Sequence, residues 1–304
     1  MADQFAARET TDRQLPVGEE IFLDHVGHFV RDPQAARRAL ARAGFAPTPA
    51  SVQVNPVPGG VPQSAGTGNV TAMLTRGYLE VLFKTADTPL GRELEAAMAR
   101  YPGVHLAALT VADAAKAHRR LTDSGLRVQP LVQMQRPVDT GGAPGTVAFT
   151  IARPEPGQMP EGRVQILTHR TEAMLWQQRW LSHPNGALAL TGITIAVADI
   201  DEAARRFARF TGREARPSPS GRTIALDRGR IDLVTADAFA SRFPEVPIPD
   251  LPFMGSYEIV VRSLATLEAV LVAGGLKPRK TDKGLVAQFP SELGQGAWLF
   301  ASRG

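Results

Sequence analysis

The feature that most constrains the fold is a pattern that occurs four times along this 304-residue chain. Each copy begins with a short run rich in Val, Ile and Ala, passes through an acidic or hydroxyl residue into an amphipathic stretch, and stops at a glycine. The copies begin near Ile21, His105, Leu190 and Tyr257. An apolar run followed by a capped, periodic segment predicts a β-strand followed by an α-helix.

The four expected helices share the same boundary chemistry. An N-cap or first-turn residue is expected at Asp32, Asp113, Asp201 and Ser263. A left-handed residue that ends the helix is expected at Gly44, Gly125, Gly212 and Gly275. Further strand-like runs follow each helix, such as "YLEVLFK" in the first copy and "GRIDLVT" in the third. The repeating unit is therefore βαβββ.

One βαβββ unit has an open sheet and a single covering helix, so we expect the units to bury their faces and edges in pairs. The predicted class is α+β, with four βαβββ units paired into two domains. We expect a mobile N-terminal arm over residues 1–20, an N-terminal domain over 21–170, a packed linker over 171–187 and a C-terminal domain over 188–304. The linker carries two of the three tryptophans, which favours contact with the body.

Composition excludes several other classes of protein. The chain has no cysteine, which excludes disulfides and thiolate metal sites. Its net charge of +4 comes from 34 basic and 30 acidic residues that are scattered, unlike the dense basic tract of a nucleic-acid-binding protein. No apolar run reaches the length of a membrane span, and the N-terminus lacks the apolar region of a signal peptide. We expect a cytoplasmic protein with a small-molecule substrate and without nucleic-acid or membrane partners, and a homodimer stays open.

Four polar residues occupy equivalent positions in the first two units. His25 and His105 stand in the first strands, and Glu80 and Gln165 stand in the last strands. Because side chains alternate along a strand, a polar residue between apolar neighbours projects from the opposite face. Two strands from each unit can therefore bring these four side chains into one cavity. In the third and fourth units glycine replaces the histidines, so no equivalent site is expected there.

These residue types are ligands of first-row divalent metals. Imidazole nitrogen and carboxylate oxygen suit Zn, Fe, Ni, Co or Mn, and two histidines with one carboxylate leave coordination positions open to substrate. Two other interpretations stay open. His25 can be a hydrogen-bonded core residue, and Glu80 can face water on an exposed sheet. The equivalent placement in two repeats favours a metal site.

The chain resembles the vicinal-oxygen-chelate superfamily, whose members pair βαβββ modules around a metal cup. Within it, the motifs "LDHVGHFV", "GTGN", "YLEVL" and "HPNGA" resemble bacterial glyoxalase-like proteins. The resemblance implies metal ligands at His25, Glu80 and His105, with Gln165 at a position that is glutamate in many relatives. Losing that carboxylate makes oxygen chemistry less expected, and it leaves Glu80 as the residue that can move a proton.

Three further residues are candidates for the same cavity. Asn69 and Tyr78 lie in or near strands that line the expected cup and could bind substrate oxygens, although Asn69 can also be a turn residue. His169 lies four positions after Gln165, hence on the same face, and can support the ligands or act as a fifth one.

The leading hypothesis is a metal-dependent glyoxalase-like enzyme with isomerase or lyase chemistry. A divalent ion would chelate a small substrate through adjacent oxygens, and Glu80 would shuttle the proton. The C-terminal pair of units would be a degenerate copy. Two alternatives are a metal-free protein that binds or sequesters a small molecule, and an extradiol ring-cleaving dioxygenase.

Overall fold

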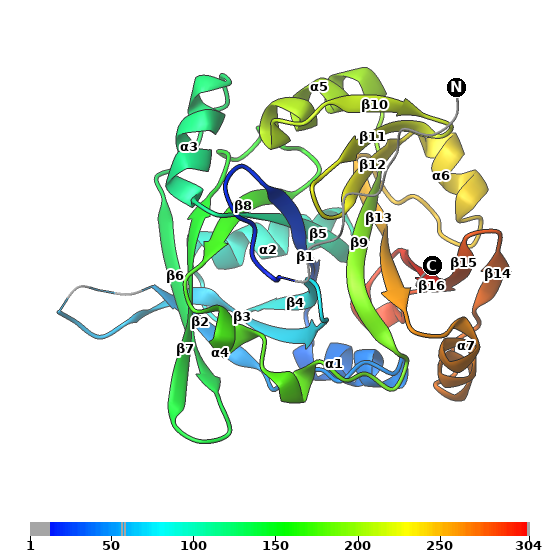
Figure 1. Ribbon diagram of the computed structural model, residues 1–304, viewed down its shortest axis with the longest axis horizontal. Helices are drawn as coiled ribbons and strands as arrows, with labels where there is room; N and C mark the ends of the chain where they lie inside the picture. Colours follow the sequence, from blue (N-terminus) through cyan, green and yellow to red (C-terminus); the bar gives the residue numbers. More distant parts are fainter. Residues whose placement is uncertain (1–12, 56, 58, 303–304) are drawn as a thin grey trace.

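The computed structural model describes residues 13–55, 57 and 59–302, and it confirms the α+β class with four βαβββ units (Figure 1). The first unit consists of β1 (Ile21–Phe29), α1 (Pro33–Arg42), β2 (Ser51–Asn55), β3 (Gln63–Met73) and β4 (Tyr78–Lys84). The second consists of β5 (Gly103–Val111), α3 (Ala114–Asp123), β6 (Val132–Asp139), β7 (Pro144–Ala152) and β8 (Arg163–His169).

The second half repeats this order of elements. The third unit consists of β9 (Ala187–Ala196), α5 (Ile200–Thr211), β10 (Ala215–Ser218), β11 (Gly221–Ala225) and β12 (Arg230–Val234). The fourth consists of β13 (Phe253–Val261), α7 (Leu264–Ala273), β14 (Arg279–Thr281), β15 (Gly284–Gln288) and β16 (Ala297–Ser302). The connections contain α2 (Pro89–Arg100), α4 (Glu172–Leu175), the 3₁₀ helix η1 (Gln178–Trp180), α6 (Ala236–Arg242) and the 3₁₀ helix η2 (Ser291–Leu293).

Local chemistry sets the helix boundaries much as the sequence predicts. The side chains of Asp32 and Asp113 accept hydrogen bonds from backbone amides of α1 and α3, and Ser263 does the same for α7. The N-cap of α5 is Asp199, and Asp201 lies in the first turn. The glycines expected to end the helices all have φ between 67° and 85°, the left-handed region that costs glycine little.

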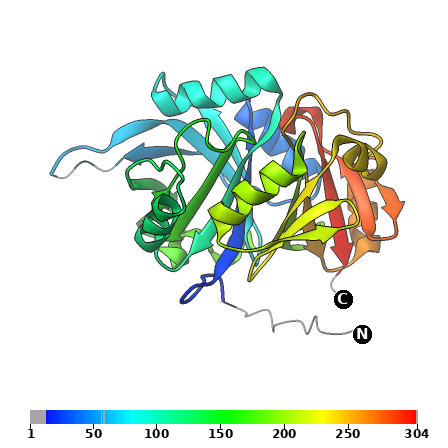
Figure 2. The ribbon, with the colours of Figure 1, turned by 90° about the horizontal axis from the view of Figure 1, so that it is seen from above.

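The strands of the first two units form a closed ring in the order β1-β4-β3-β2-β6-β7-β8-β5, and β5 pairs with β1 to close it. The strands of the other two units continue from β13 in two directions, to β9-β12-β11-β10 and to β16-β15-β14. A single pairing, Met254 with Val104, joins β13 to β5. Figures 1 and 2 show the two halves side by side. Helix α2 packs Leu94 and Met98 against the apolar side chains inside the ring.

Side chains of the ring strands alternate between two environments. Val26 of β1 packs into the large core shared by both halves, whereas Phe29 packs inside the ring. Leu82 and Leu106 also pack inside the ring, beside Gly27, where an added Cβ would lie 3.0 Å from Cβ of Leu106. The ring interior is therefore partly filled with apolar side chains, and polar groups occupy the remaining space.

The expected N-terminal arm and the expected linker lie outside the two predicted domains. Residues 1–12 of the arm lie outside the described residues. Arg13 and Gln14 of the same arm accept hydrogen bonds from Arg228 at their backbone carbonyls. In the expected linker, Leu175 is buried and Trp176 contacts the ring interior. The domain boundaries themselves stay a prediction. In the described part of the chain no helix is long and apolar enough to cross a bilayer.

Candidate functional site

Four of the predicted site residues lie together on the inner face of the ring. Nδ2 of Asn69 donates a hydrogen bond of 2.6 Å to Oε1 of Glu80. Nε2 of His25 lies 3.5 Å from Oε2 of the same carboxylate. The rings of His25 and Tyr78 are stacked with centroids 4.3 Å apart. Since all four residues are at most 5% exposed, this is a polar cluster inside the protein, and Glu80 does not face water.

Two further residues complete this cluster, and one of them was not predicted. The carboxylate of Asp24, fully buried, lies 2.7 Å from Nδ1 of His25 and 2.8 Å from Nε2 of His169. An ionised carboxylate only accepts hydrogen bonds, so both of these ring nitrogens donate. The contact orients His25 with its other nitrogen, Nε2, toward Glu80.

A β-bulge explains why Asp24 and His25, which are adjacent in sequence, join the same cluster. Neighbouring residues of a regular strand point to opposite faces. The pairing of β1 with β5 is irregular between Leu23 and His25, so Asp24 is an extra residue in the ladder. A bulge re-aims side chains in this way. The fourth unit repeats the device, since β13 is irregular around Gly255.

Burial and charge set the protonation of two cluster residues. Burial alone would raise the pKa of Asp24, but the charge and hydrogen bond of His169 and the hydrogen bond of His25 outweigh it and hold that pKa well below its ordinary value. Burial raises the pKa of Tyr78 well above its ordinary value, and the charges of Asp24 and Glu80 raise it further. At neutral pH Asp24 is therefore a carboxylate and Tyr78 a phenol.

The other two predicted metal ligands are placed differently. Nε2 of His105 lies 2.6 Å from the carbonyl oxygen of Tyr101, and the two rings are stacked. Oε1 of Gln165 accepts two hydrogen bonds from Arg153. In the described chain no hydrogen bond or ion pair joins either residue to His25 or Glu80. His105 also lies in the bulge opposite Gly27 and His28, where the simple alternation of side chains fails.

The donor set does not fit the expected metal centre. A structural or catalytic ion of the kinds considered needs at least three protein ligands that converge on one point. No three His, Asp or Glu side chains among residues 13–55, 57 and 59–302 are arranged to hold an ion. The predicted tetrad of His25, Glu80, His105 and Gln165 is divided between two places.

A cavity of about 570 Å³ lies near the cluster, and its lining residues are neighbours of the cluster and not its members. It is lined by Thr71, which is paired with Glu80 across β3 and β4, and by Arg136 of β6. Arg136 is 6% exposed, its Nε has no hydrogen-bond partner, and its Nη1 makes one long contact of 3.4 Å with Ser51. Burial lowers the pKa of Arg136, while the charges of Tyr78 and Glu80 oppose that shift, so the guanidinium lies within electrostatic reach of the cluster.

The segment that follows β8 forms one wall of this cavity. Leu175 and Trp180 line it, together with Pro137 and Val138 of β6. Trp176 packs edge-on against Tyr78 and His169, with ring centroids 6.0 and 4.8 Å apart. The cavity therefore combines an apolar wall with one buried cation, which suits a small organic anion.

The equivalent region of the third and fourth units has its charges paired. Arg230 forms hydrogen bonds of 3.1 and 2.7 Å with the two carboxylate oxygens of Glu258, and one of 3.0 Å with Asp232. Thr191 and Thr223 donate to the same carboxylates. Asp232 occupies the position that Glu80 has in the first unit, but its carboxylate already accepts hydrogen bonds from Thr223 and Arg230. This contrast makes the first pair of units the better candidate for chemistry.

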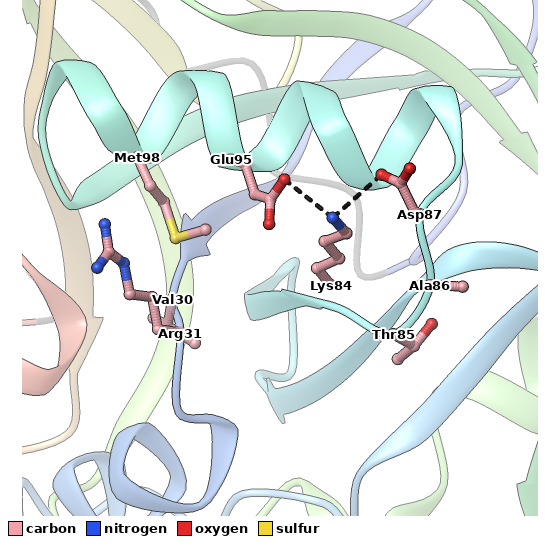
Figure 3. A pocket seen from close by; sticks show the side chains of 8 residues that line it. All are labelled: Val30, Arg31, Lys84, Thr85, Ala86, Asp87, Glu95 and Met98. Atoms are coloured by element: carbon pink, nitrogen blue, oxygen red, sulfur yellow. Dashed lines mark hydrogen bonds and ion pairs between the residues drawn. The ribbon is translucent and has the colours of Figure 1, made fainter.

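A larger cavity, of about 780 Å³, lies near α2 and the end of β4 (Figure 3). Lys84 projects between Glu95 and Asp87, at 2.9 and 3.2 Å. The hydrogen bond with Glu95 is the main reason that the pKa of Lys84 is raised. Because its lysine already has two carboxylate partners at the surface, this cavity is a weaker candidate for a catalytic site.

Sequence reasoning missed Asp24 and Arg136 and gave His169 only a supporting position. A signal for Asp24 was present, since an aspartate inside the apolar run "IFLDHV" needs a buried partner. The signal for Arg136 is weaker. It lies two positions after Met134, so both side chains lie on the inner face of β6. His169 was expected on the face of Gln165 in a supporting position, and its Nε2 contacts the carboxylate of Asp24.

Comparison with known proteins gives a family and a fold. Residues 23–211 match the family model described as "Glyoxalase-like domain". No curated protein matches the chain. A hypothetical protein from Staphylococcus aureus is similar in structure, with a TM-score of 0.63, 10% identity, and coverage of 93% of this chain and 100% of that one.

Two further solved structures are similar. A mutant of 4-hydroxymandelate synthase from Streptomyces coelicolor has a TM-score of 0.57 and 14% identity, and 94% of each chain is covered. A xylose isomerase-like TIM barrel/4-hydroxyphenylpyruvate dioxygenase fusion protein has a TM-score of 0.53 and 12% identity, over 96% of this chain and 50% of that one. At these identities the likeness shows the fold.

Proposed function

This chain belongs to the glyoxalase-like domain family of the vicinal-oxygen-chelate superfamily, and on that premise we propose that it is an enzyme that moves a proton next to the carbonyl group of a small organic anion. The reaction class is an isomerisation or a lyase-type step. The observation that carries the proposal is the row Asp24–His25–Glu80, in which a buried carboxylate orients an imidazole toward a second carboxylate, beside a cavity with a buried arginine.

Glu80 is the proposed base. Its Oε1 is held by Asn69 at 2.6 Å, so Oε2 is the oxygen that can take a proton. In the proposed step the C–H bond beside the substrate carbonyl breaks, the proton goes to Oε2, and the electron pair moves onto the carbonyl oxygen as an enolate. Return of the proton to the same or the neighbouring carbon completes an exchange or an isomerisation.

His25 and Asp24 are proposed to share the proton with Glu80. Nε2 of His25 lies 3.5 Å from Oε2 of Glu80 and can take the proton that Glu80 has received. The imidazolium formed in this way would lie 2.7 Å from the ionised Asp24, which stabilises it. Tyr78, kept as a phenol by burial, is the proposed donor of a hydrogen bond to the enolate oxygen.

Arg136 is the proposed anchor for the substrate anion. A guanidinium binds a carboxylate or phosphate through two parallel hydrogen bonds, and Nε of Arg136 is a donor that the protein leaves unpaired. The apolar wall with Leu175 and Trp180 suits the substrate's hydrocarbon part. Two of the similar solved structures are a 4-hydroxymandelate synthase and a 4-hydroxyphenylpyruvate dioxygenase fusion, and an organic acid as the substrate class fits both names.

Many members of the superfamily bind a divalent metal ion, and metal dependence was the hypothesis drawn from the sequence. The proposal here does not depend on an ion, because the donors of this chain are divided between two places. A proton transfer by Glu80 needs no oxidant or reductant. The dioxygenase alternative, by contrast, needs molecular oxygen as a co-reactant.

The test is proton exchange in deuterated water. Pyruvate, 2-oxobutanoate and phenylpyruvate are incubated with the purified protein, and loss of the signal of the proton beside the carbonyl is followed by NMR. We expect catalysed exchange for at least one of them, lost in Glu80→Gln and retained in Glu95→Gln, whose residue lies at the surface cavity. Binding without exchange would instead identify a protein that sequesters the anion. Equal exchange by Glu80→Gln would overturn the role of Glu80.

A further inference from the structure

A second cavity, of about 290 Å³, lies between α2 and the strands β5 and β8. It has no lining residue in common with the cavity at Arg136. Polar side chains on its wall include Glu93 from α2, His105 from β5, Arg163 from β8 and Arg153 from the segment between β7 and β8. Two of the predicted metal-site residues, His105 and Gln165, therefore belong to the surroundings of this cavity.

The two arginines on its wall are buried and have one carboxylate between them. Arg153 is 8% exposed, and both its Nε and its Nη2 donate to Oε1 of Gln165, at 3.1 and 2.8 Å. Arg163 is 6% exposed, and its Nε donates to Oε1 of Glu93 at 2.9 Å. Among the described residues, no carboxylate forms an ion pair with Arg153.

Unpartnered atoms occur at the same place. Nη2 of Arg163 is buried without a hydrogen-bond partner. Burial in the first place, and the charge of Arg163 in the second, lower the pKa of Arg153 to about 10, so the two guanidiniums repel each other. Leaving a buried donor or charge unpaired is costly, and proteins rarely retain such groups without a use for them.

His105 supplies an acceptor on the same wall. A carbonyl oxygen only accepts hydrogen bonds, so Nε2 of His105 carries the proton in its 2.6 Å contact with Tyr101. Burial lowers the pKa of His105 to about 4, so the ring is neutral at pH 7 and its Nδ1 has a free lone pair. That Nδ1 is buried without a partner.

The charges on the wall of this cavity do not balance. At the cavity beside α2, Glu93 balances one guanidinium and the other has an uncharged amide as its partner. Glu155, also on the wall, is paired with Arg127. The local excess of positive charge is therefore built into the first two units.

We propose that this cavity is a binding site for a small oxyanion, the carboxylate or phosphate group of an organic molecule, with Arg153 and Arg163 as its recognition residues and Nδ1 of His105 as the acceptor for a hydroxyl group of the same ligand. The site is separate from the Glu80 cluster. It does not depend on the proposed function, and the protein would hold two anions at once.

The test is binding of inorganic phosphate and, separately, of acetate, at constant ionic strength maintained with sodium chloride. Titration calorimetry of the full chain measures the affinity, and the two probes distinguish a phosphate site from a carboxylate site. We expect saturable binding of one probe. Because a charge-assisted hydrogen bond is lost, Arg153→Gln is expected to bind at least about tenfold more weakly. Arg153→Lys is expected to retain part of the affinity.

Arg136→Gln is the control that separates this proposal from the proposed function. It removes the anion anchor of the other cavity, so one binding event is expected to survive in it. Equal binding by wild type and Arg153→Gln, or no saturable binding by wild type, would overturn the proposal. Should Arg153→Gln fail to fold, diffraction from wild-type crystals soaked in phosphate decides. An anion within hydrogen-bond distance of Arg153 and Arg163 supports the site, and an empty cavity contradicts it.

Discussion

Nδ2 of Asn69 lies 2.6 Å from Oε1 of Glu80, so one oxygen of this buried carboxylate is held and the other faces His25. The amide therefore positions the proposed base. Asn69→Ala leaves the carboxylate without this donor, and removal of a hydrogen bond to a charged group costs about 1.5–3 kcal/mol. We expect exchange at least about tenfold slower, with an unchanged circular dichroism spectrum. A rate within twofold of wild type would show that Asn69 does not position Glu80.

Asp24 is expected to hold the cluster together through its charge. Asp24→Asn keeps the shape of the side chain but weakens both contacts with His25 and His169. Removing one partner of a buried pair costs about 3–5 kcal/mol, which urea denaturation at pH 7 would measure. Asp123→Asn, at an exposed position at the end of α3, is expected to change stability by less than about 0.5 kcal/mol.

The effect of Asp24→Asn should depend on pH in a defined direction. The pKa of Asp24 is held below its ordinary value of 3.8. Its contribution to stability is therefore present above pH 3.8 and is lost as the pH falls through the lower pKa of the folded state. The difference between wild type and the variant should shrink below about pH 4. A difference that grows on acidification would contradict the assignment of Asp24 as the ionised partner.

His28 makes a second contribution to the pH profile, with the same sign but at higher pH. It is fully buried between the carbonyl of Leu293 and the hydroxyl of Tyr257, each 2.8 Å away. Burial is the main reason that its pKa is lowered from 6.5 to about 4, and the charge of His105 contributes to the same shift. The unfolded chain therefore binds more protons between these values, and stability falls as the pH drops from 6.5 to 4, by about 3 kcal/mol for this group.

His28→Gln tests this contribution through the slope of the profile. Urea midpoints are measured for wild type and variant at several values between pH 7 and pH 4.5. The variant is expected to lose less free energy of unfolding than wild type as the pH drops from 7 to 4.5, whatever its stability at pH 7. His105, whose pKa is also lowered to about 4, continues to contribute in the variant. Identical slopes would show that His28 is not the group that burial keeps neutral.

Metal content distinguishes the observed cluster from the tetrad expected from the sequence. We expect the dialysed protein to contain much less than one equivalent of Zn, Fe, Ni, Co or Mn by mass spectrometry. His25→Ala and His105→Ala should not differ from wild type, because their side chains do not share a set of donors. One equivalent of metal in wild type, lost in both variants, would restore the tetrad.

The sequence predicted the fold well because its signals were local and repeated. The strand–helix–glycine pattern needs only the 3.6 and 2.0 periodicities and the left-handed glycines, and those glycines, such as Gly44 and Gly125, have the expected φ. The short strands β10 and β14 were missed, since runs of four and three residues carry little periodicity. Helices α2 and α6 lie outside the repeat and were also missed.

The site was predicted in part, and its failures share a cause. His25, Glu80, Asn69 and Tyr78 lie on regular alternation and meet as expected. Asp24 and His105 lie at irregularities of the β1–β5 ladder, where side-chain direction cannot be read from sequence spacing.

Arg136 was missed for a different reason. It has no motif around it, and a buried arginine on an amphipathic strand looks like a surface residue until its neighbours are known.

The most direct test of the account is proton exchange by protein that has been treated with a chelator and dialysed. Exchange beside the carbonyl of the best 2-oxo carboxylate is measured before and after treatment, and again after addition of each divalent ion. The account predicts an unchanged rate after chelation and a loss of at least about hundredfold in Glu80→Gln. A rate abolished by chelation and restored by one ion would contradict it.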